Sequence, residues 1–411
     1  MVPNGWKVLP LSSITKWSSG GTPSKNNPDY WNGEIPWISA ASMRGHYFEK
    51  SELKITDLAV SNGAKIAPKD SLLLLVRGSM LWNKIPVGIA VKRVSFNQDV
   101  KCLVPLADEL TTEFLLYWFL TNEHRLMSMV TGTGIGAGKL DTTDLQGLDV
   151  FLPPLSEQRK IAKILSTWDK AIATTEKLIE TSKQQKKALM QQLLMGKKRL
   201  VNPETGKAFE GEWRDVKLRK LGKCITGLTY SPSDVVEEGT LVLRSSNIQR
   251  GKLSFLDNVF VSSPIKEDSR TRIGDILICV RNGSRNLIGK SAYITDEASG
   301  QAHGAFMTLF RGKYPEFVYQ LFQTPLFFRQ VNKNLGATIN SINTSDLHKF
   351  KFYLPKDETE IAKIASLLTA ADKEIEVLED KLAHFKQEKK ALMQQLLTGK
   401  RSVKVDEMEA A

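Results

Sequence analysis

The chain has few of the residues that build metal centres or disulfide frameworks. It contains three cysteines, Cys102, Cys224 and Cys279, and five histidines, and neither set has a spacing that suits zinc or paired disulfides. Its longest aliphatic run, 72–76, is far shorter than a membrane span, and no amino-terminal segment resembles a signal peptide. We therefore expect a soluble cytoplasmic protein with no metal site and no membrane contact.

Two segments approach enzyme motifs without completing them. The segment 27–30, Asn-Pro-Asp-Tyr, differs at Asp29 from the N-P-P-Y tetrapeptide of amino-methyltransferases, and no clear glycine-rich cofactor motif accompanies it. The run 132–139 is rich in glycine, but a P-loop would need glycine in place of Thr133 and serine or threonine in place of Leu140. We predict no catalytic residues and interpret 132–139 as a flexible connector.

Proline and glycine are absent from two long stretches, 156–195 and 357–398, and a glycine follows each of them. Ser156 is a candidate cap for the first stretch, and Asp357 with Glu360 forms a capping-box pattern for the second. The glycines suit the left-handed position beyond a helix end. Each stretch therefore predicts one helix of forty residues or so, about 60 Å long.

The two predicted helices belong to an internal repeat. The segment KKALMQQLLMGK, 186–197, returns 203 positions later as KKALMQQLLTGK, 389–400, with Met195 replaced by Thr398. Similarity at the same offset continues upstream, where 161–172 aligns with 364–375. The chain is a long tandem duplication.

Apolar residues recur along both helices at alternating steps of four and three, the pattern of a coiled-coil seam. The seam residues are Ile161, Leu165, Trp168, Ile172, Ile179, Leu189, Leu193, Ile364, Leu368, Ile375, Leu378, Leu382, Phe385, Leu392 and Leu396. Either the two helices pair with each other or each packs only on its own globular domain. A parallel pair would oppose Lys186 and Lys389 in the seam, so we predict an antiparallel pair, with Lys389 over Trp168 and Lys186 beside Ala371.

The duplication and the helix boundaries divide the chain into six parts. They are a globular region at 1–154, a helix at 155–197, a linker at 198–212, a second globular region at 213–355, a second helix at 356–400 and a tail at 401–411. Short strand-like runs and one amphipathic helix, 111–129 or 315–331, predict an α+β fold for each globular region. Trp6 and Gly20 match Trp213 and Gly227.

The globular copies diverge while the helices stay alike, which suggests two related modules that read different partners. The chain has a formal net charge of +12, and the segment 200–355 holds 21 basic against 15 acidic residues. Such a surplus favours a polyanionic partner. Two similar readers with approximate two-fold symmetry would suit duplex DNA, where readers on one face lie about one helical turn apart.

Candidate base readers lie in loops that follow predicted strands and carry arginine or asparagine, which suit guanine and adenine edges. They are Arg44, Arg77, Lys84, Arg244, Asn247, Arg250, Arg281, Asn282, Arg285 and Asn286. For each of them, a phosphate contact or an exposed surface charge is the alternative role.

Taken together, these features resemble the specificity subunit of type I restriction-modification systems. The similarity covers nearly the whole chain through WKVLPLSSI, GGTPS, IPWIS, FNQDVK, LPPLSEQRKIAKIL and the doubled KKALMQQLL. The second half departs from this pattern at 301–306, where QAHGAF stands in place of NQDVKC at 97–102.

This resemblance implies two target-recognition domains, each reading half of a bipartite, asymmetric site in double-stranded DNA, with conserved helices as a spacer. It implies no cofactor in this chain, two methyltransferase subunits that use S-adenosylmethionine, and two motor-nuclease subunits that use ATP and Mg²⁺. Two other classes remain open: a coiled-coil adaptor without sequence-specific DNA binding, and a catalytic DNA methyltransferase.

Overall fold

A computed structural model describes residues 3–134, 136–335 and 340–404. The chain forms two compact units, Met1–Glu176 with Asp380–Ala411, called unit 1, and Lys177–Glu379, called unit 2. Each unit contains one globular domain and about half of each long helix. Parts of the predicted tail, of the glycine-rich run 132–139 and of its counterpart near 335–347 lie outside the described residues.

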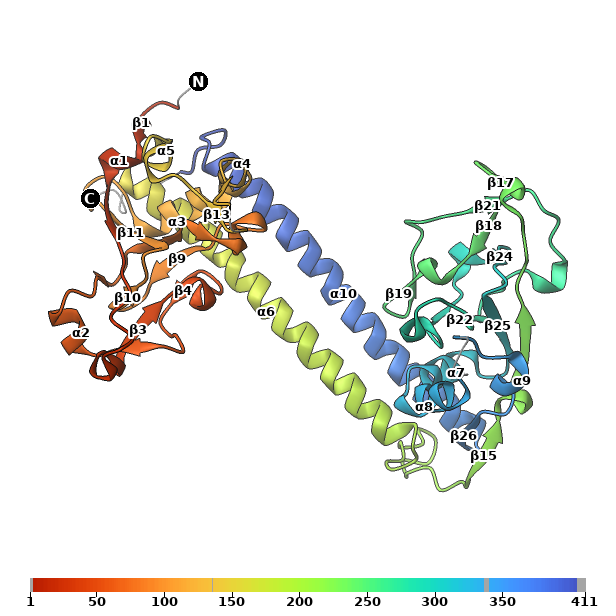
Figure 1. Cartoon of the computed structure of the whole chain (residues 1–411). Coiled ribbons are helices and arrows are strands. Elements are labelled where there is room, and N and C mark those ends of the chain that lie inside the picture. Colours follow the sequence, from red (N-terminus) through yellow and green to blue (C-terminus); the bar gives the residue numbers. More distant parts are fainter. Residues whose placement is uncertain (1–2, 135, 336–339, 405–411) are drawn as a thin grey trace. The chain divides into compact units, whose positions relative to one another are not determined.

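The globular part of unit 1 is a mixed α+β domain (Figure 1). Its strands are β1 (Lys7–Pro10), β2 (Thr15–Ser19), β3 (Trp31–Ile38), β4 (Tyr47–Phe48), β5 (Lys54–Ile55), β6 (Ile66–Ala67), β7 (Leu72–Leu75), β8 (Arg77–Gly78), β9 (Val87–Ala90), β10 (Val94–Phe96), β11 (Val100–Pro105), β12 (Thr131–Gly132), β13 (Gly138–Lys139) and β14 (Asp149–Leu152). Its helices are α1 (Leu11–Ile14), α2 (Asp57–Ser61), α3 (Thr112–Thr121), α4 (Glu123–Ser128) and α5 (Thr142–Gln146).

The core of unit 1 forms around β7, the aliphatic run of the sequence. A five-stranded sheet has the order β2-β11-β7-β9-β4, and a four-stranded sheet has the order β5-β3-β10-β6. All four leucines of β7 are fully buried, and α3 packs on β7 and β9. A strand that is covered on both faces has no polar side to display, which explains its uninterrupted apolar sequence.

Unit 2 repeats this architecture. Its strands are β15 (Trp213–Lys217), β16 (Gly222–Thr226), β17 (Val235–Val236), β18 (Thr240–Leu243), β19 (Ile248–Gln249), β20 (Lys252–Leu253), β21 (Phe260–Val261), β22 (Ile276–Cys279), β23 (Ser291–Tyr293), β24 (Ala302–His303), β25 (Met307–Gly312) and β26 (Lys351–Pro355). Its short helices are α7 (Pro315–Phe322), α8 (Pro325–Asn334) and α9 (Thr344–Leu347).

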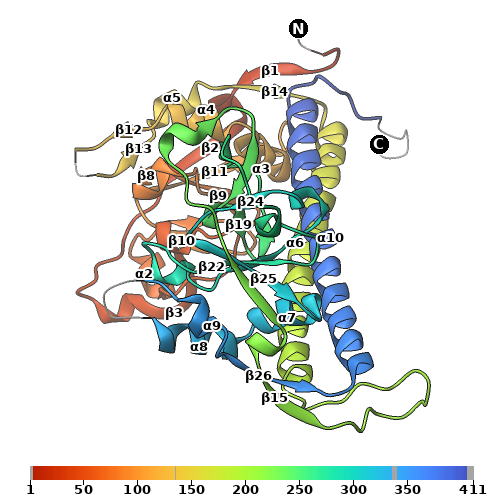
Figure 2. The same cartoon turned by 90° about the vertical axis from the view of Figure 1, so that its right-hand side faces the viewer.

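The two domains share the order of their main sheets. The order β16-β25-β22-β23 corresponds to β2-β11-β7-β9, and the parallel pair β18–β24 corresponds to β3–β10. In each unit the first strand pairs antiparallel with the last, β1 with β14 and β15 with β26, and Figure 2 shows both pairs. The predicted α+β class and internal repeat are therefore confirmed.

One matched glycine pair has a packing reason in the structure. A Cβ on Gly20 would lie 2.2 Å from the carbonyl oxygen of Phe96, and a Cβ on Gly227 would lie 2.1 Å from that of Gly304. Both distances are far below any real contact, so any larger residue would push the backbones apart. The same close crossing of two chain segments was kept in both copies.

The amphipathic helix predicted in each domain is interrupted. The segment 111–129 forms α3 and α4, which are separated by Asn122, and 315–331 falls within α7 and α8, which are separated by Gln323 and Thr324. The side chain of Thr324 accepts a hydrogen bond from the backbone of Phe327 and so caps a new helix. Apolar residues continue at helical spacing across each break, so the sequence alone did not reveal that the helix is interrupted.

The glycine-rich run is better ordered than a flexible connector. Strand β12 pairs with β13, and β13 pairs with β8, so the run forms a hairpin in a three-stranded sheet. The connector interpretation was wrong for its described residues, because backbone pairing to Arg77 and Gly78 holds the second arm in place.

The two predicted long helices are present as α6 (Leu155–Leu193) and α10 (Glu358–Leu396), each of 39 residues (Figure 1). Gly196 and Gly399 have φ angles of 65° and 70°, the left-handed conformation expected beyond the helix ends. Asp357 caps α10 through its side chain, whereas α6 begins one residue before Ser156, which is therefore not its cap. No described helix is both long and apolar enough to cross a membrane.

Contacts inside each unit show that α6 and α10 run antiparallel. In unit 1, Asp169 pairs with Lys389 at 2.5 Å and Glu176 with Lys386 at 2.7 Å, so the partner on α10 moves back as α6 proceeds. In unit 2 the same holds, since Lys183 pairs with Glu379 at 2.6 Å and Lys186 with Asp372 at 2.5 Å. All the residues of the predicted seam are buried or half-buried, and the predicted antiparallel pair is confirmed.

The helices also pack into the globular cores, so the two alternatives for their packing are not exclusive. Ile161 and Leu165 of α6 join the core of unit 1, and Leu193 joins that of unit 2. Ile364 and Leu396 of α10 do the same in the reverse order. Each helix thus contributes apolar surface to both units.

Candidate nucleic-acid interface

The predicted loops that begin at Arg77 and Arg281 each follow an interior strand of the main sheet of their domain. In unit 1, Arg77 begins β8 and pairs with Lys139 of β13. In unit 2, Arg281 occupies the same place after β22 and forms an isolated bridge with Ser341. The same framework therefore holds both loops, although their sequences differ.

Hydrogen bonds join two of the predicted clusters in unit 2. The amide nitrogen of Asn282 donates to the hydroxyl oxygen of Ser245 at 3.0 Å, which connects the loop 281–286 to the turn 244–247. The side-chain oxygen of Asn282 accepts from the backbone nitrogen of Ser284, so this residue shapes its own loop. Arg285 and Asn286 are exposed and available to a partner.

Asn247 is a correction to the predicted set. It is fully buried, and its side-chain oxygen accepts from the backbone nitrogen of Arg244 at 2.9 Å. Its amide nitrogen donates to the carbonyl oxygens of Ser254 and Asp257. Because its polar atoms hold the turn together, Asn247 cannot present them to a base in this conformation.

The other two predicted residues of this cluster have different surroundings. The guanidinium of Arg244 pairs with Asp257 at 3.0 Å, and its side chain is about one-third exposed. Arg250 lies at the tip of the β19–β20 hairpin with φ of 52° and lines a cavity with residues of α10. Lys252 of the same hairpin pairs with Glu376 of α10, so this hairpin lies against the helix.

The predicted residues of unit 1 are all exposed. Arg44 lines a cavity of about 370 Å³ together with Trp37 and Ser42. Arg77 and Lys84 flank a 3₁₀ turn that contains Trp82. The indole nitrogen of Trp82 donates to the carbonyl oxygen of Gly136, which attaches this turn to the β12–β13 hairpin.

Two exposed aromatic residues extend these loops and were absent from the predicted set. Phe306 is 56% exposed, and its ring centroid lies 5.6 Å from the guanidinium carbon of Arg281. Trp82 is 48% exposed beside the loop of unit 1. An aromatic ring beside an arginine can stack on a nucleic-acid base. The signal for Phe306 was its place in QAHGAF, where the second copy departs from the first.

A carboxylate on each long helix joins three elements, an arrangement we call a carboxylate junction. In unit 1, Asp169 of α6 accepts from the hydroxyl of Tyr117 in α3 at 2.7 Å and pairs with Lys389 of α10 at 2.5 Å. The ammonium of Lys389 also lies 5.5 Å from the ring centroid of Tyr117. Burial and the bond to Asp169 raise the pKa of Tyr117, so the hydroxyl stays a donor.

Unit 2 contains the equivalent junction, in which each residue lies 203 positions from its counterpart in unit 1. The carboxylate and the lysine have exchanged helices. Asp372 of α10 accepts from the amide of Gln320 in α7 at 2.8 Å and pairs with Lys186 of α6 at 2.5 Å. The ammonium of Lys389 pairs with Asp169 and does not lie over Trp168 as predicted, while that of Lys186 pairs with Asp372, the neighbour of the predicted Ala371. An adjacent carboxylate attracts an ammonium more strongly than a ring or a methyl group does.

We expect Asp169→Asn or Asp372→Asn to lower the free energy of unfolding by about 1–3 kcal/mol, measured by urea titration. The amide can still accept a hydrogen bond, but Lys389 and Lys186, whose side chains are 14% and 13% exposed, would lose their counter-charge. The control Glu176→Gln breaks a half-exposed pair and should cost less than about 1 kcal/mol. Equal losses in all three variants would contradict the role of the junctions.

Burial also raises the pKa of the cysteine thiols. It raises the pKa of Cys224 to about 12 and that of Cys279 to about 11. At pH 8 both thiols should remain protonated, since a thiol reacts as its thiolate. We expect iodoacetamide to label native protein far more slowly than urea-unfolded protein, as measured by mass spectrometry. Rapid labelling of either cysteine in the native state would be inconsistent with this packing.

Comparison with known families identifies the domain type. The family model described as the type I restriction modification DNA specificity domain matches residues 3–184 and again 210–387. A type I restriction enzyme specificity subunit of Methanocaldococcus jannaschii, MjaVIII, is 28% identical over 98% of this chain and 94% of its own length. The EcoR124I/EcoR124II specificity subunit of Escherichia coli is 31% identical over 40% of each chain.

Solved structures show the same fold. The crystal structure of a type I restriction-modification S subunit from M. genitalium has a TM-score of 0.62 at 17% identity and covers 97% of this chain and 98% of its own. A chain from a study of complex assembly in a type I restriction-modification system has a TM-score of 0.56 at 17% identity, covering 98% and 100%. The two family matches cover most of the sequence, and so the chain belongs to the type I restriction-modification specificity subunits and contains two target-recognition domains.

Proposed function

We propose that each recognition domain reads one half of a bipartite, asymmetric site in double-stranded DNA. The observation that carries this proposal is the pair of equivalent loops that begin at Arg77 and Arg281. Both are held by backbone pairing, Arg77 with Lys139 and Arg281 with Ser341, and their exposed residues differ. A constant framework with different reading residues suits two different half-sites.

In this proposal α6 and α10 set the spacing between the two half-sites. The pair is antiparallel, and each unit holds the start of one helix and the end of the other. A carboxylate junction in each unit ties a recognition domain to both helices. These contacts support a spacer whose length is fixed by the number of residues in the helices.

The chain itself performs no chemistry in this proposal. Two methyltransferase subunits that use S-adenosylmethionine would dock on the helices and adjoining surfaces, and two motor-nuclease subunits that use ATP and Mg²⁺ would complete the restriction complex. The relatives are specificity subunits, and one similar structure comes from a study of complex assembly, which supports partners of this kind.

Changing Arg281 and Arg285 to alanine tests the reading role. Within the assembled methyltransferase, we expect discrimination at one half-site to fall by about 1–3 kcal/mol per lost base contact, while the other half-site is read as before. Competition binding with duplexes that vary at single positions measures this. Arg329→Ala, an exposed arginine on α8, is the matched control. Unchanged recognition at both half-sites would remove this loop from the interface.

The two alternative functions, a catalytic DNA methyltransferase and a coiled-coil adaptor, make different predictions. A catalytic methyltransferase would bind S-adenosylmethionine without partner subunits, which calorimetry on the isolated chain would detect. An adaptor without DNA recognition would give an assembled complex that binds all duplexes equally. Either result would contradict the proposed function.

A further inference from the structure

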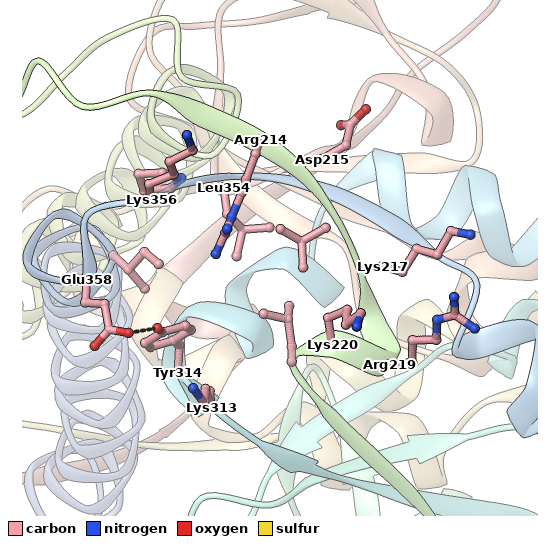
Figure 3. Close-up of a pocket in the computed structure, with 14 residues that line it drawn as sticks. Arg214, Asp215, Lys217, Arg219, Lys220, Lys313, Tyr314, Leu354, Lys356 and Glu358 are labelled. Carbon is pink, nitrogen blue, oxygen red and sulfur yellow. Dashed lines mark hydrogen bonds between the residues drawn. The ribbon is translucent and has the colours of Figure 1, made fainter.

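Unit 2 contains a strongly basic cavity outside the loops that carry the predicted readers. The cavity measures about 630 Å³ and is lined by β15, the turn after it, the β25–α7 connection and the start of α10 (Figure 3). Its lining cations are Arg214, Lys217, Arg219, Lys220, Lys313 and Lys356, and its lining carboxylates are Asp215 and Glu358.

Few of these cations are neutralised within the protein. Lys356 pairs with Glu212 at 2.5 Å, and Glu358 already accepts a hydrogen bond from the hydroxyl of Tyr314. Among the described residues, the other five cations have no carboxylate at ion-pair distance. All five belong to the segment 200–355, which holds 21 basic against 15 acidic residues.

The equivalent place in unit 1 has the opposite character. The cavity there measures about 280 Å³, and its charged lining is Lys7, Asp108 and Glu109, with Lys7 paired to Glu109 at 3.2 Å. Lys7 and Arg214 are counterparts, because each pairs in register with the matching leucine, Leu152 or Leu354.

The length of one connection explains the difference. Six residues, 106–111, join β11 to α3 in unit 1, and they bring both carboxylates into the space. Only Lys313 and Tyr314 join β25 to α7 in unit 2, where Tyr314 adopts a left-handed φ of 51° to complete the short turn. The shorter connection leaves the cavity open and replaces two acidic residues by a lysine.

The lining suits phosphate groups better than base edges. It contains four lysines and two arginines, which bind phosphate oxygens, and no asparagine or glutamine that could read an adenine edge. Such contacts add affinity and position the protein without selecting a sequence.

We infer that this cavity of unit 2 binds phosphates of a DNA backbone independently of sequence, and that unit 1 has no equivalent site among its described residues. The inference rests on the proposed function, because that function brings duplex DNA to the chain. It gives the two otherwise similar units unequal roles, with unit 2 supplying an additional electrostatic contact.

The test compares salt dependence in the full chain assembled with its methyltransferase subunits. The variant carries Arg219→Gln, Lys220→Gln and Lys313→Gln, and the matched control carries Lys54→Gln, Lys65→Gln and Lys69→Gln, three exposed lysines of unit 1. The probe is a duplex without the methylated motif. We expect the slope of log Kobs against log salt to become less negative by about three in the variant and to change little in the control.

Other results would overturn the inference. An unchanged slope in the variant, or an equal change in the control, would show that the cavity has no particular role. Weaker binding of methyltransferase subunits with an unchanged slope would identify an acidic protein surface as the ligand instead. The single variant Lys313→Gln, expected to change the slope by about one, covers the case in which the triple variant folds poorly.

The proposed function can fail separately from this inference. If the wild-type complex did not distinguish a motif-bearing duplex from the probe, half-site reading would be wrong. The slope on the probe alone would still decide whether the cavity binds phosphates. If both stand, the ratio of motif to probe affinity should be the same in variant and wild type.

Discussion

Replacing Arg199 with methionine is expected to lower the free energy of unfolding of unit 2 by about 3–5 kcal/mol. Arg199 donates from two guanidinium nitrogens to the two carboxylate oxygens of Glu360, each at 2.6 Å. The side chain of Glu360 is completely buried, whereas that of Arg199 is 23% exposed. Without the arginine, a buried carboxylate would have no counter-charge and no water to solvate it.

Replacing Arg199 and replacing Glu360 should lower the free energy of unfolding by different amounts. Glu360→Gln should cost less than Arg199→Met, because it removes the buried charge and leaves an arginine that water can partly solvate. The double variant Arg199→Met, Glu360→Met should recover much of the loss, since well-packed apolar pairs often replace buried ion pairs without cost.

Urea unfolding, with hydrogen exchange to separate the two units, measures these effects. Glu157→Gln is the control in unit 1, where the equivalent carboxylate accepts from the indole of Trp6 and, among the described residues, has no arginine partner. A loss below about 1 kcal/mol for Arg199→Met would contradict the importance of this ion pair. The result would also show that Glu360 is more solvated than its burial indicates.

Inserting seven residues into both long helices is expected to reduce methylation of the original site at least about 100-fold. The insertions would follow Glu176 in α6 and Glu379 in α10, the equivalent positions where the two units divide. Seven residues preserve the seam and lengthen each helix by about 10 Å, close to three base pairs. If the helices set the spacing, one half-site would lose its contacts, at about 1–3 kcal/mol per mismatched base pair.

Duplexes with variable spacers would give the complementary result. The preferred spacer should become longer, with weaker binding at the new optimum, because three base pairs also rotate the groove by about 100°. The control insertion of four residues in both helices shifts the seam and should impair the pairing itself. Unchanged preference for the original spacer after the seven-residue insertion would show that α6 and α10 do not set it.

The helical part of the fold could be predicted from sequence because repeat, composition and apolar period agree. The absence of glycine and proline from 156–195 and 357–398 predicted the helix lengths. The two lysines in the seam favoured the antiparallel direction. The partners of these lysines could not be predicted. Tyr117 and Gln320 reach Asp169 and Asp372 from helices more than fifty residues away. No local pattern reports such contacts.

The candidate site was less accessible to sequence reasoning. Residue type could single out Arg281 and Asn247 alike, but only the structure shows that Arg281 is exposed while Asn247 is buried within its own turn. Glu360 matched a capping box, yet it binds Arg199. A polar side chain has the same preferences in a loop, a cap or a buried pair, so its role depends on neighbours that are distant in sequence.

Sequencing of methylated bases in host DNA, with and without this chain, tests the central claim most directly. Two readers held apart by one helical spacer predict a single motif of two unlike half-sites, each with a methylated adenine, separated by a constant number of unspecified bases. With Arg281 and Arg285 changed to alanine, one half-site should relax while the other half-site and the spacing stay the same. A continuous palindromic motif, or half-sites at variable distances, would contradict the account.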